Sequence, residues 1–463
     1  MQYISTRGQD APISFADALL AGLARDGGLY LPTEWPQFAD GELMAMASMP
    51  YAEVAARIMA KFTGDDLSFD ELLGISQNAY ATFSADEVTP LTRINDQIHL
   101  CELYHGPTIA FKDVAMQVLS RLFDYELKKR GSKAVILGAT SGDTGSAALE
   151  AFRGRNMVDI FILYPDGRVS PVQEQQMTSV IADGAHAVAV AGDFDDCQAI
   201  VKSLFGDLAF RDHVGLSAIN SINWARLMPQ IVYYVTSVLA LGGLEKPISF
   251  AVPTGNFGNI FAGYAAMKMG LPIKQFICAS NCNDILTRFF DTGVMERRMV
   301  EPSLSPSMDI QVSSNFERLM FELLGRDGAQ TRDIMTRFNN TGQFTLTRDM
   351  MASDINMFSG FRCDDAATLN EISQTWRNDG IMVDPHSAIG LAAGREAAKS
   401  SDDQIVALAC AHPAKFPDAV EKATGIRPEL PPHLADLMER QHQRLTAAAT
   451  TDAVAGLIQN HSR

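Results

Sequence analysis

The sequence predicts an α/β protein with two lobes, each built on a mostly parallel sheet, preceded by a mainly helical N-terminal part. Three observations support this fold class: apolar runs rich in β-branched residues alternate with helical stretches, glycine-rich loops follow two of those runs, and the chain has 463 residues. Strands covered by helices on both faces read as continuous apolar runs. A chain of this length has room for two or three domains with sizeable cores.

The elements follow from the pattern of apolar residues along the chain. Apolar residues recur every three to four positions in 14–24 and 49–64, which predicts two helices joined through the Gly/Pro loop RDGGLYLP. From about residue 98 the pattern changes to strand, loop and helix. Strands are expected within 133–154, at 158–165 and 185–192, within 248–270, at 274–280 and within 404–416. The tail from residue 431 is expected to be helical and peripheral.

Composition excludes several classes of partner. The net charge of −17, from 55 acidic and 38 basic residues, argues against nucleic acid or an anionic membrane. A small anionic substrate remains open, because salt screens the overall field within about 8–10 Å and local donors then decide. The apolar runs are too short to span a bilayer, and the start MQYISTRGQD does not resemble a signal peptide, so a cytoplasmic location is expected.

The six cysteines predict neither a disulfide framework nor a zinc site. Only Cys278 and Cys282 lie close together in the sequence, and no second cluster completes a set of metal ligands. Reduced thiols are therefore expected.

Lys112, in HGPTIAFKD (105–113), is the first candidate for chemistry. The stretch that follows it has one broad apolar face and ends at Gly131, which predicts a helix that begins near Lys112. The N-terminus of a helix disfavours an ammonium, and a desolvated neutral amine is a nucleophile toward carbonyl groups. The alternative is a solvated lysine without a role.

Two loops between a strand and a helix are candidate anion sites. PTGNFGN (253–259) has two glycines that let backbone N–H groups approach a phosphate, and it lacks the lysine of an ATP-binding loop. TSGDTGS (140–146) offers small hydroxyl residues to a carboxylate or a phosphate, and its spacing is not that of a dinucleotide-binding loop. Each loop alone is equally compatible with an ordinary strand-to-helix turn.

Two further segments are weaker candidates. INSINWARL (219–227) places Arg226 near two amides and a hydroxyl, which together suit an anionic group, or else form a polar surface loop. ACAHPAKF (409–416) ends an apolar strand, where parallel sheets bind ligands. His412 and Lys415 in that segment suit a functional role by position, but the preferred interpretation is that both are satisfied structural residues.

Taken together, the motifs resemble those of a known family. HGPTIAFKD, TSGDTGSAA, NSINWAR, PTGNFGN and AHPAKF occur in the order found in threonine synthases of the long bacterial and fungal type. YISTRG and RDGGLYLP resemble the N-terminal region of the same family, so that the resemblance runs from about residue 3 to 420. One such loop is a weak signal, whereas five in order are specific.

The resemblance implies a fold-type-II pyridoxal-phosphate enzyme, similar to the tryptophan synthase β chain. It implies an N-terminal domain at 1–95, a large cofactor-binding α/β domain at 96–133 and 241–463, and a small inserted α/β domain at 134–240. The active site is expected between the two α/β lobes.

The resemblance also assigns site residues. Lys112 becomes the catalytic lysine that forms a Schiff base with pyridoxal 5′-phosphate. The cofactor phosphate is assigned to Gly255, Asn256, Phe257, Gly258 and Asn259. The substrate carboxylate and the cofactor ring are expected near Ser141, Gly142, Asp143 and Thr144. The substrate phosphate is assigned to Asn220, Ser221, Asn223 and Arg226. No metal is implied.

One position departs from the family pattern. Members often carry Thr or Ser just before AHPAKF, where the hydroxyl faces the pyridine nitrogen, and this chain has Cys410. A thiol is a weaker donor, so the ring nitrogen is expected to stay unprotonated. Alternatively, Cys410 is only a packed core residue.

The implied activity is that of a carbon–oxygen lyase of threonine biosynthesis. It converts O-phospho-L-homoserine and water into L-threonine and phosphate. The alternatives are a serine/threonine dehydratase-type lyase that also uses pyridoxal phosphate, a non-catalytic relative, and more remotely a nucleotide-binding protein built on TSGDTG. The sequence leaves open whether the chain is a monomer or a homodimer, and it assigns no role to His105.

Overall fold

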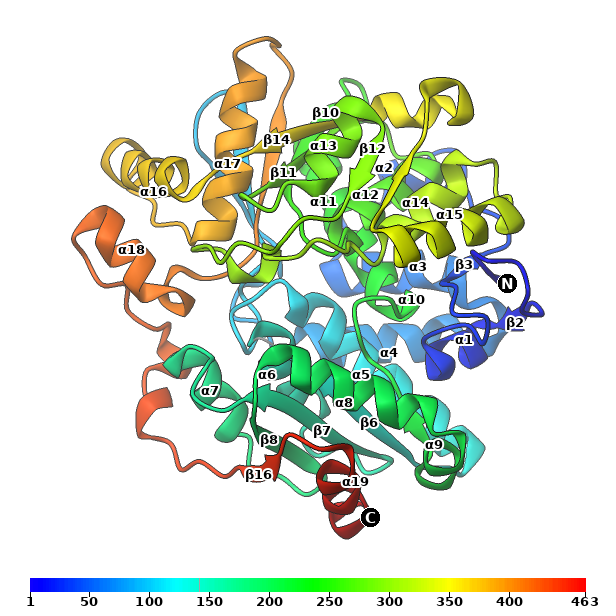
Figure 1. Ribbon diagram of the computed structural model, residues 1–463. Helices are drawn as coiled ribbons and strands as arrows, with labels where there is room; N and C mark the ends of the chain where they lie inside the picture. Colours follow the sequence, from blue (N-terminus) through cyan, green and yellow to red (C-terminus); the bar gives the residue numbers. More distant parts are fainter. Residues whose placement is uncertain (141) are drawn as a thin grey trace.

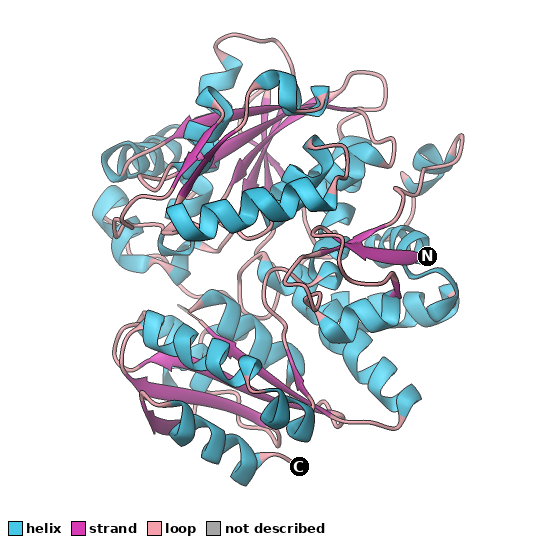
Figure 2. Cartoon of the chain, turned by 45° about the vertical axis from the view of Figure 1, so that its right-hand side comes forward, coloured by secondary structure: helices cyan, strands magenta, loops and turns pink. Residues whose placement is uncertain are grey.

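A computed structural model describes residues 1–140 and 142–463 of the chain. Two sheets lie in separate halves of the molecule, and helices cover both faces of each (Figures 1 and 2). The α/β fold with mostly parallel sheets that the sequence predicted is confirmed.

The larger sheet has six strands, and one of them leads into the loop at 253–259 that is predicted to bind a phosphate. Its order is β14 (Phe358–Arg362), β11 (Ile273–Ser280), β10 (Ile248–Pro253), β15 (Ile405–Ala409), β5 (Ile98–Glu102) and β4 (Leu91–Arg93). All neighbours pair in parallel except β4 and β5. Alternate residues of β10 face different cores, with Phe250 and Val252 on one side and Ala251 on the other. The sheet is therefore buried on both faces.

The helices of this half follow from the strand–helix alternation. Two helices begin at predicted site motifs: α12 (Gly258–Lys268) lies in this half, whereas α5 (Lys112–Arg130) packs chiefly against α6 (Asp143–Phe152) and α4 (Phe69–Tyr80). The others are α10 (Trp224–Leu227), α11 (Ile231–Ala240), α13 (Ile285–Thr292), α14 (Phe316–Leu323), α15 (Gly328–Thr341), α16 (Asp365–Asp379), α17 (Pro385–Ala398) and α18 (Pro417–Thr424). The short strands β12 (Val294–Glu296) and β13 (Gln343–Thr345) form an antiparallel pair.

The smaller sheet has five strands, all parallel. Its order is β16 (Leu445–Ala448), β8 (Ala185–Ala191), β7 (Val158–Pro165), β6 (Ala134–Ala139) and β9 (Leu216–Ser217). The helices of this half are α6 (Asp143–Phe152), α7 (Pro171–Thr178), α8 (Phe194–Gly206), α9 (Leu208–Val214) and α19 (Thr451–His461).

The C-terminal tail differs from its expected form. It was predicted to be helical and peripheral, but β16 pairs with β8 at the edge of the smaller sheet, and α19 packs on α8 (Figure 1). Pairing satisfies the backbone groups of an edge strand that would otherwise stay open. The expected small domain, 134–240, thus leaves out one strand of its own sheet; the other expected domain limits remain predictions.

The N-terminal part is helical, as predicted, with one addition. It contains α1 (Phe15–Ala21), α2 (Glu42–Met46), α3 (Tyr51–Thr63) and α4 (Phe69–Tyr80), together with an antiparallel sheet of β1 (Gln2–Ser5), β2 (Ile13–Ser14) and β3 (Tyr30–Pro32). Strands this short carry too few residues for a period-two pattern, so the sequence did not indicate them. Among the described residues, no helix combines the length and the apolar character needed to cross a membrane.

Candidate active site

Lys112 is the first residue of α5, and a constrained turn sets its position. Ile109 has a φ of 55°, in the left-handed region that β-branched residues rarely adopt. The turn is held by Phe111 N–H, which donates to the Cys410 carbonyl at 2.7 Å, and by His412 N–H, which donates to the Ile109 carbonyl at 3.0 Å. The end of β15 therefore fixes the backbone from which Lys112 projects, and backbone strain of this kind is often found at functional sites.

The Lys112 side chain is almost buried, with 11% of it exposed, so it is not a solvated surface lysine. Its Nζ lies 3.1 Å from Asp143 Oδ2 and 4.9 Å from the centre of the Phe111 ring. The sequence predicted an amine kept neutral by the start of a helix. The structure places a carboxylate beside this amine, a contact that the sequence did not predict.

Asp143, the first residue of α6, accepts hydrogen bonds on both oxygens. The donors are Lys112 Nζ (3.1 Å) and Ser307 Oγ (3.1 Å) on Oδ2, and Gln173 Nε2 (2.8 Å) and Lys415 Nζ (3.2 Å) on Oδ1. Burial alone would raise the pKa of this carboxyl, but Lys112, and then Lys415, hold the pKa well below its usual range. Asp143 is therefore a buried carboxylate, and it points at the amines of Lys112 and Lys415.

The loop at 254–258 joins β10 to α12 and forms a cradle of backbone donors. The backbone N–H groups of residues 255–259 donate no hydrogen bond to any of the described residues. Phe257 adopts a φ of 63°, which turns the chain sharply into α12. Asn259 accepts from Tyr233 at 2.6 Å and from Tyr234 at 2.9 Å, while its buried Nδ2 has no partner among those residues. Open donors at a helix N-terminus suit a phosphate.

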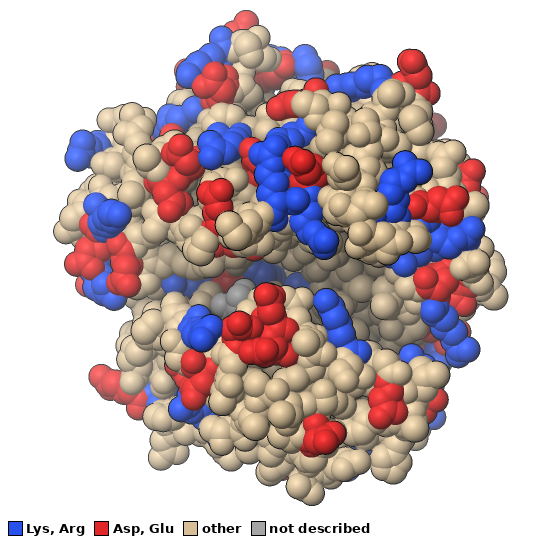
Figure 3. Space-filling view, in the orientation of Figure 1, with Lys and Arg blue, Asp and Glu red and all other residues tan. Residues whose placement is uncertain are grey.

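The cradle and Lys112 meet through the segment at Pro306–Met308. A Cβ on Gly255 would lie 2.8 Å from the Ser307 carbonyl, and the Ser307 hydroxyl donates to Asp143, the partner of Lys112. Figure 3 shows a groove across this face, between the half that carries β10 and the half that carries β6, with Lys and Arg atoms inside it. Two motifs about 140 residues apart thus come together.

The segment at 219–227 borders the cradle through Asn315. The Asn315 side-chain amide donates to the Ser221 carbonyl at 3.0 Å, and its N–H donates to the Asn256 carbonyl at 3.1 Å. Arg226 is buried; its Nη1 donates to the Ile219 carbonyl, and its Nε has no partner among the described residues. Burial lowers the pKa of Arg226 to about 10.

The other two residues of that segment lie differently. Asn223 is fully buried, and its side chain donates to the Leu19 carbonyl and caps α10 by accepting from Ala225 N–H. Its side chain therefore ties the N-terminal part to α10 and uses one of its two N–H donors to do so. Asn220 is exposed.

The TSGDTGS loop begins α6 with open donors. Among the described residues, the N–H groups of Asp143 and Thr144 have no acceptor. Gly142 has a φ of 144°, and a Cβ there would meet the Gln173 side chain at 2.3 Å, so the close approach requires glycine. Ser141, predicted to lie near the substrate carboxylate, falls outside the described residues.

Lys415 and a buried pair in DPHSA were not among the predicted site residues. Lys415, interpreted from sequence as structural, has no exposed surface and lies 3.2 Å from Asp143 Oδ1. His386 Nδ1 lies 2.6 Å from Asp384 Oδ2, and its Nε2 accepts from Ser307 N–H, which places the ring proton on Nδ1. The sequence did offer one signal for Lys415, because a lysine just after an apolar strand is unusual. For Asp384 and His386, the stretch DPHSA indicates only the start of a helix.

Cys410 joins the site from β15. Burial, strengthened by Asp384, raises the pKa of its thiol well above the usual range, although Lys112 partly opposes the shift. The Cys410 N–H donates to Ser387 Oγ, and the Ser387 hydroxyl donates in turn to Asp384. The thiol therefore stays protonated and remains a hydrogen-bond donor.

Two histidines of the motifs have structural roles. His412 caps the turn that follows it by accepting from Ala414 N–H, and burial, with His105 adding to it, lowers the pKa of His412 to about 4. His105 pairs with Glu102 at 2.8 Å, at the end of β5. The structural interpretation of His412 is thus supported.

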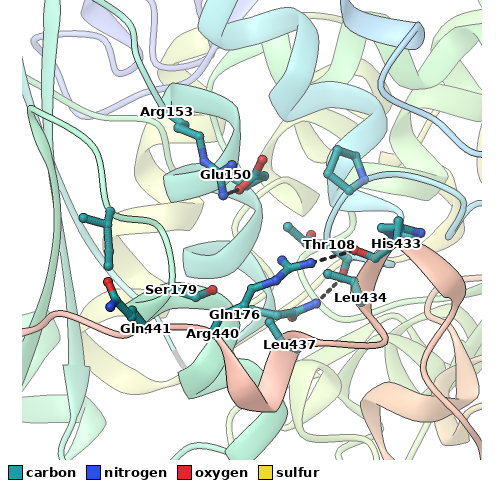
Figure 4. A pocket seen from close by; sticks show the side chains of 12 residues that line it. Thr108, Glu150, Arg153, Gln176, Ser179, His433, Leu434, Leu437, Arg440 and Gln441 are labelled. Atoms are coloured by element: carbon teal, nitrogen blue, oxygen red, sulfur yellow. Dashed lines mark hydrogen bonds and ion pairs between the residues drawn. The ribbon is translucent and has the colours of Figure 1, made fainter.

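A cavity of about 530 Å³ lies apart from these residues, between α6, α7 and the segment at 433–441 (Figure 4). Its lining includes Thr108, whose carbonyl accepts from Gln176 Nε2 at 3.1 Å, and none of the predicted site residues. The arrangement around Lys112, rather than this cavity, carries the candidate chemistry.

Comparisons with known proteins decide the family. The family model described as "Pyridoxal-phosphate dependent enzyme" matches residues 84–411, "Threonine synthase N terminus" matches 2–80, and "Threonine synthase, C-terminal" matches 387–458. A threonine synthase of Pseudomonas aeruginosa is 46% identical over 100% of this chain and 98% of its own length. The chain belongs to the threonine synthase family.

Solved structures agree with this membership. A pyridoxal-phosphate-bound threonine synthase of Brucella melitensis is 51% identical, with a TM-score of 0.97 over 100% of both chains. The yeast threonine synthase is 36% identical, with a TM-score of 0.93 over 99% of this chain and 98% of its own. The fold-type-II α/β fold expected from the resemblance is thereby confirmed. As a threonine synthase family member, the chain is a pyridoxal-phosphate-dependent enzyme.

Proposed function

We propose that the chain converts O-phospho-L-homoserine and water into L-threonine and phosphate at the groove between the two sheets. The observation that carries the proposal is the buried Lys112 amine, which is joined through Asp143 and Ser307 to a cradle of unclaimed N–H groups. An amine and a phosphate cradle in this relation suit pyridoxal phosphate, which presents an aldehyde and a phosphate to the protein.

The residues fit this cofactor by their donor chemistry. Gly255, Asn256, Phe257, Gly258 and Asn259 hold its phosphate with backbone N–H groups, and the unpartnered Asn259 Nδ2 adds a further donor. Lys112 would carry its aldehyde, and the protonated Cys410 thiol is the candidate donor to its ring nitrogen. When bound, the cofactor supplies an electron sink that stabilises negative charge on the carbon beside the substrate amino group.

The chain's own groups bind the substrate and move its protons. Lys112 Nζ takes the proton from the substrate α-carbon and then one from the β-carbon, and it delivers a proton to the γ-carbon as the phosphate leaves that carbon. After water adds its hydroxyl at the β-carbon and its other proton goes to the phosphate, the same amine returns a proton to the α-carbon. The N–H groups of Asp143 and Thr144, with Gly142 and Ser141, receive the substrate carboxylate at the start of α6.

The substrate phosphate needs donors that are already desolvated. Arg226, with a buried Nε that has no partner among the described residues, is the main ligand in this proposal. Asn220 and Ser221 supply further donors. Asn223 fixes the start of α10, and the second N–H of its side-chain amide supplies a further donor.

The test is to follow phosphate release from O-phospho-L-homoserine and to identify the amino-acid product. Threonine formed in equal amount to phosphate supports the proposal. Release of 2-oxobutyrate instead shows elimination without hydration and favours the dehydratase-type alternative. A cofactor-loaded protein without turnover on this substrate identifies a non-catalytic relative.

Gly255→Ala is expected to weaken cofactor binding. The new Cβ lies 2.8 Å from the Ser307 carbonyl and 3.3 Å from Met308 Cα, so the backbone over the cradle must move. Overpacking of about 1–3 kcal/mol corresponds to a rise of about 5- to 160-fold in the Kd of the cofactor. A cofactor titration by absorbance measures it. Gly74→Ala in α4, with no atom within 4 Å of its Cβ, is the matched control and should leave the Kd unchanged; an unchanged Kd in both variants contradicts the cradle.

Cys410→Ala separates the two roles left open for the thiol. If the thiol donates to the ring nitrogen, its loss lowers kcat about tenfold, the effect of about one hydrogen bond, and Cys410→Ser restores it. Steady-state kinetics on cofactor-saturated protein gives the answer. Full activity of Cys410→Ala means that the thiol only packs.

We further propose a cytoplasmic location and no nucleic-acid or membrane partner. The support is the net charge of −17 and the six cysteines, all free, including Cys278 and Cys282. The small-molecule substrate is the proposed partner, and the proposal holds equally for a monomer or a homodimer.

A further inference from the structure

Lys415 is a fully buried cation, and every donor of its ammonium is used. Its Nζ lies 2.8 Å from the Thr108 carbonyl, 3.2 Å from Asp143 Oδ1 and 3.5 Å from Ser146 Oγ. The same Thr108 carbonyl accepts from Gln176, as Figure 4 shows. Burial of an ammonium is costly and persists only with good partners, so this lysine is held for a reason beyond packing.

Asp143 has one lysine on each oxygen. Lys112 contacts Oδ2 and Lys415 contacts Oδ1, and Asp143 is fixed further by Gln173 and Ser307. Lys112 comes from α5 and Lys415 from the turn after β15, whereas Asp143 begins α6 beside the smaller sheet. The carboxylate is thus shared between a lysine that reacts and one that stays in place.

The proposed function requires Lys112 to lose its positive charge, since only an uncharged amine attacks an aldehyde or takes a proton. If Lys112 were the only cation beside Asp143, that loss would leave a buried carboxylate without a partner, which is strongly unfavourable. Lys415 removes this penalty, because its own ion pair with Asp143 does not depend on the state of Lys112.

We propose that Lys415 is a positioning residue for Lys112: as the permanent counter-ion of Asp143, it keeps the carboxylate charged and in place while Lys112 gives up its proton. The inference rests on the proposed role of Lys112 as the cofactor lysine.

Other charged groups around Lys415 do not replace this pair. Asp113 also faces Lys415, but burial raises the pKa of Asp113 even though Lys415 lowers it, and its carboxylate is bound by Thr108. His386 faces Asp143 from α17, and Cys410 lies near both Lys112 and Asp143 as a protonated thiol. Burial lowers the pKa of Lys415, with Asp143 as the first opposing influence.

The test is a pH titration of the visible absorbance of cofactor-loaded protein, which follows the proton on the Lys112 nitrogen without turnover. Without Lys415, the Asp143 carboxylate keeps Lys112 as its remaining lysine partner and holds the proton on that nitrogen more tightly, so the midpoint in Lys415→Met should move up by about one pH unit, a tenfold change in proton affinity. Asp143→Asn deletes a negative charge, and the midpoint should move down. The ascending limb of the kcat–pH profile should follow the same two directions, while KM in Lys415→Met changes by less than about twofold because Lys415 does not touch substrate.

Controls separate this role from a structural one. Lys268→Met breaks a lysine–aspartate pair of the same length, 3.1 Å to Asp354, outside the site and should shift nothing. Lys415→Arg keeps the charge and should restore the midpoint. The double variant Asp143→Asn with Lys415→Met removes both charges of this pair, so it remains usable if Lys415→Met alone does not fold. Its midpoint should equal that of Asp143→Asn, because Lys415 acts through the Asp143 carboxylate in this proposal.

Each possible result of the titrations either supports or overturns the role of Lys415. The inference is supported if the midpoint moves up in Lys415→Met and down in Asp143→Asn, and if the double variant has the same midpoint as Asp143→Asn. Equal midpoints in all variants, shifts in one direction, or a Lys415→Met effect that persists in the Asp143→Asn background overturn it. A protein that shows no visible band at any pH contradicts the proposed function instead.

Discussion

Lys112→Ala abolishes both the visible cofactor band and turnover. The variant loses the amine that carries the aldehyde and moves the substrate proton, so kcat falls by at least about 10⁴-fold. The helix should still form, because alanine is the best helix former and the turn before Lys112 is held by backbone hydrogen bonds with Cys410 and His412. Absorbance spectra and phosphate release measure the two losses.

A lysine on the same helix provides the control. Lys128 lies near the end of α5, with 55% of its side chain exposed, and pairs with Asp124 at 2.7 Å. Lys128→Ala should change neither colour nor kcat, because exposed pairs contribute little. If a visible band survives in Lys112→Ala, another lysine binds the cofactor. Lys415 would then be the first candidate, because it contacts the same carboxylate, Asp143.

Arg226→Ala is expected to lower kcat/KM for the phosphorylated substrate by about 100- to 1000-fold, the cost of removing one partner of a buried charge pair. The physical reason is that its desolvated guanidinium has no carboxylate among its hydrogen-bond partners in the described chain, so an incoming phosphate meets a cation without competition. Turnover of amino acids without a phosphate should not change. Steady-state kinetics with both classes of substrate measures the difference.

Arg121 is the matched control for this change. Burial likewise lowers the pKa of Arg121 to about 10, and its Nη1 donates to the Gln117 carbonyl on α5. Arg121→Ala should leave kcat/KM intact. Equal losses on phosphorylated and unphosphorylated substrates in Arg226→Ala would show that Arg226 supports the fold around Ile219 and does not bind phosphate.

The sequence predicted most elements that border the site, because their signals are local. The strands at 158–165 and 185–192 and the helix that begins near Lys112 are confirmed, since runs of apolar residues and a glycine stop mark them directly. The strand β16 was missed, because LTAA is short and only its pairing with β8 makes it a strand.

The five motifs and their order in the chain determined the family, and they carry the prediction that Lys112 is the reactive lysine. The structure alone decided how these motifs meet: Asp143, which the sequence placed near an anion, turns to both Lys112 and Lys415. Such contacts join residues up to about 300 positions apart, and no pattern along the chain encodes the direction of a side chain. The sequence therefore favoured a structural role for Lys415. Its contacts with the Thr108 carbonyl and with Asp143, the carboxylate that also pairs with Lys112, exist only once both sheets are assembled.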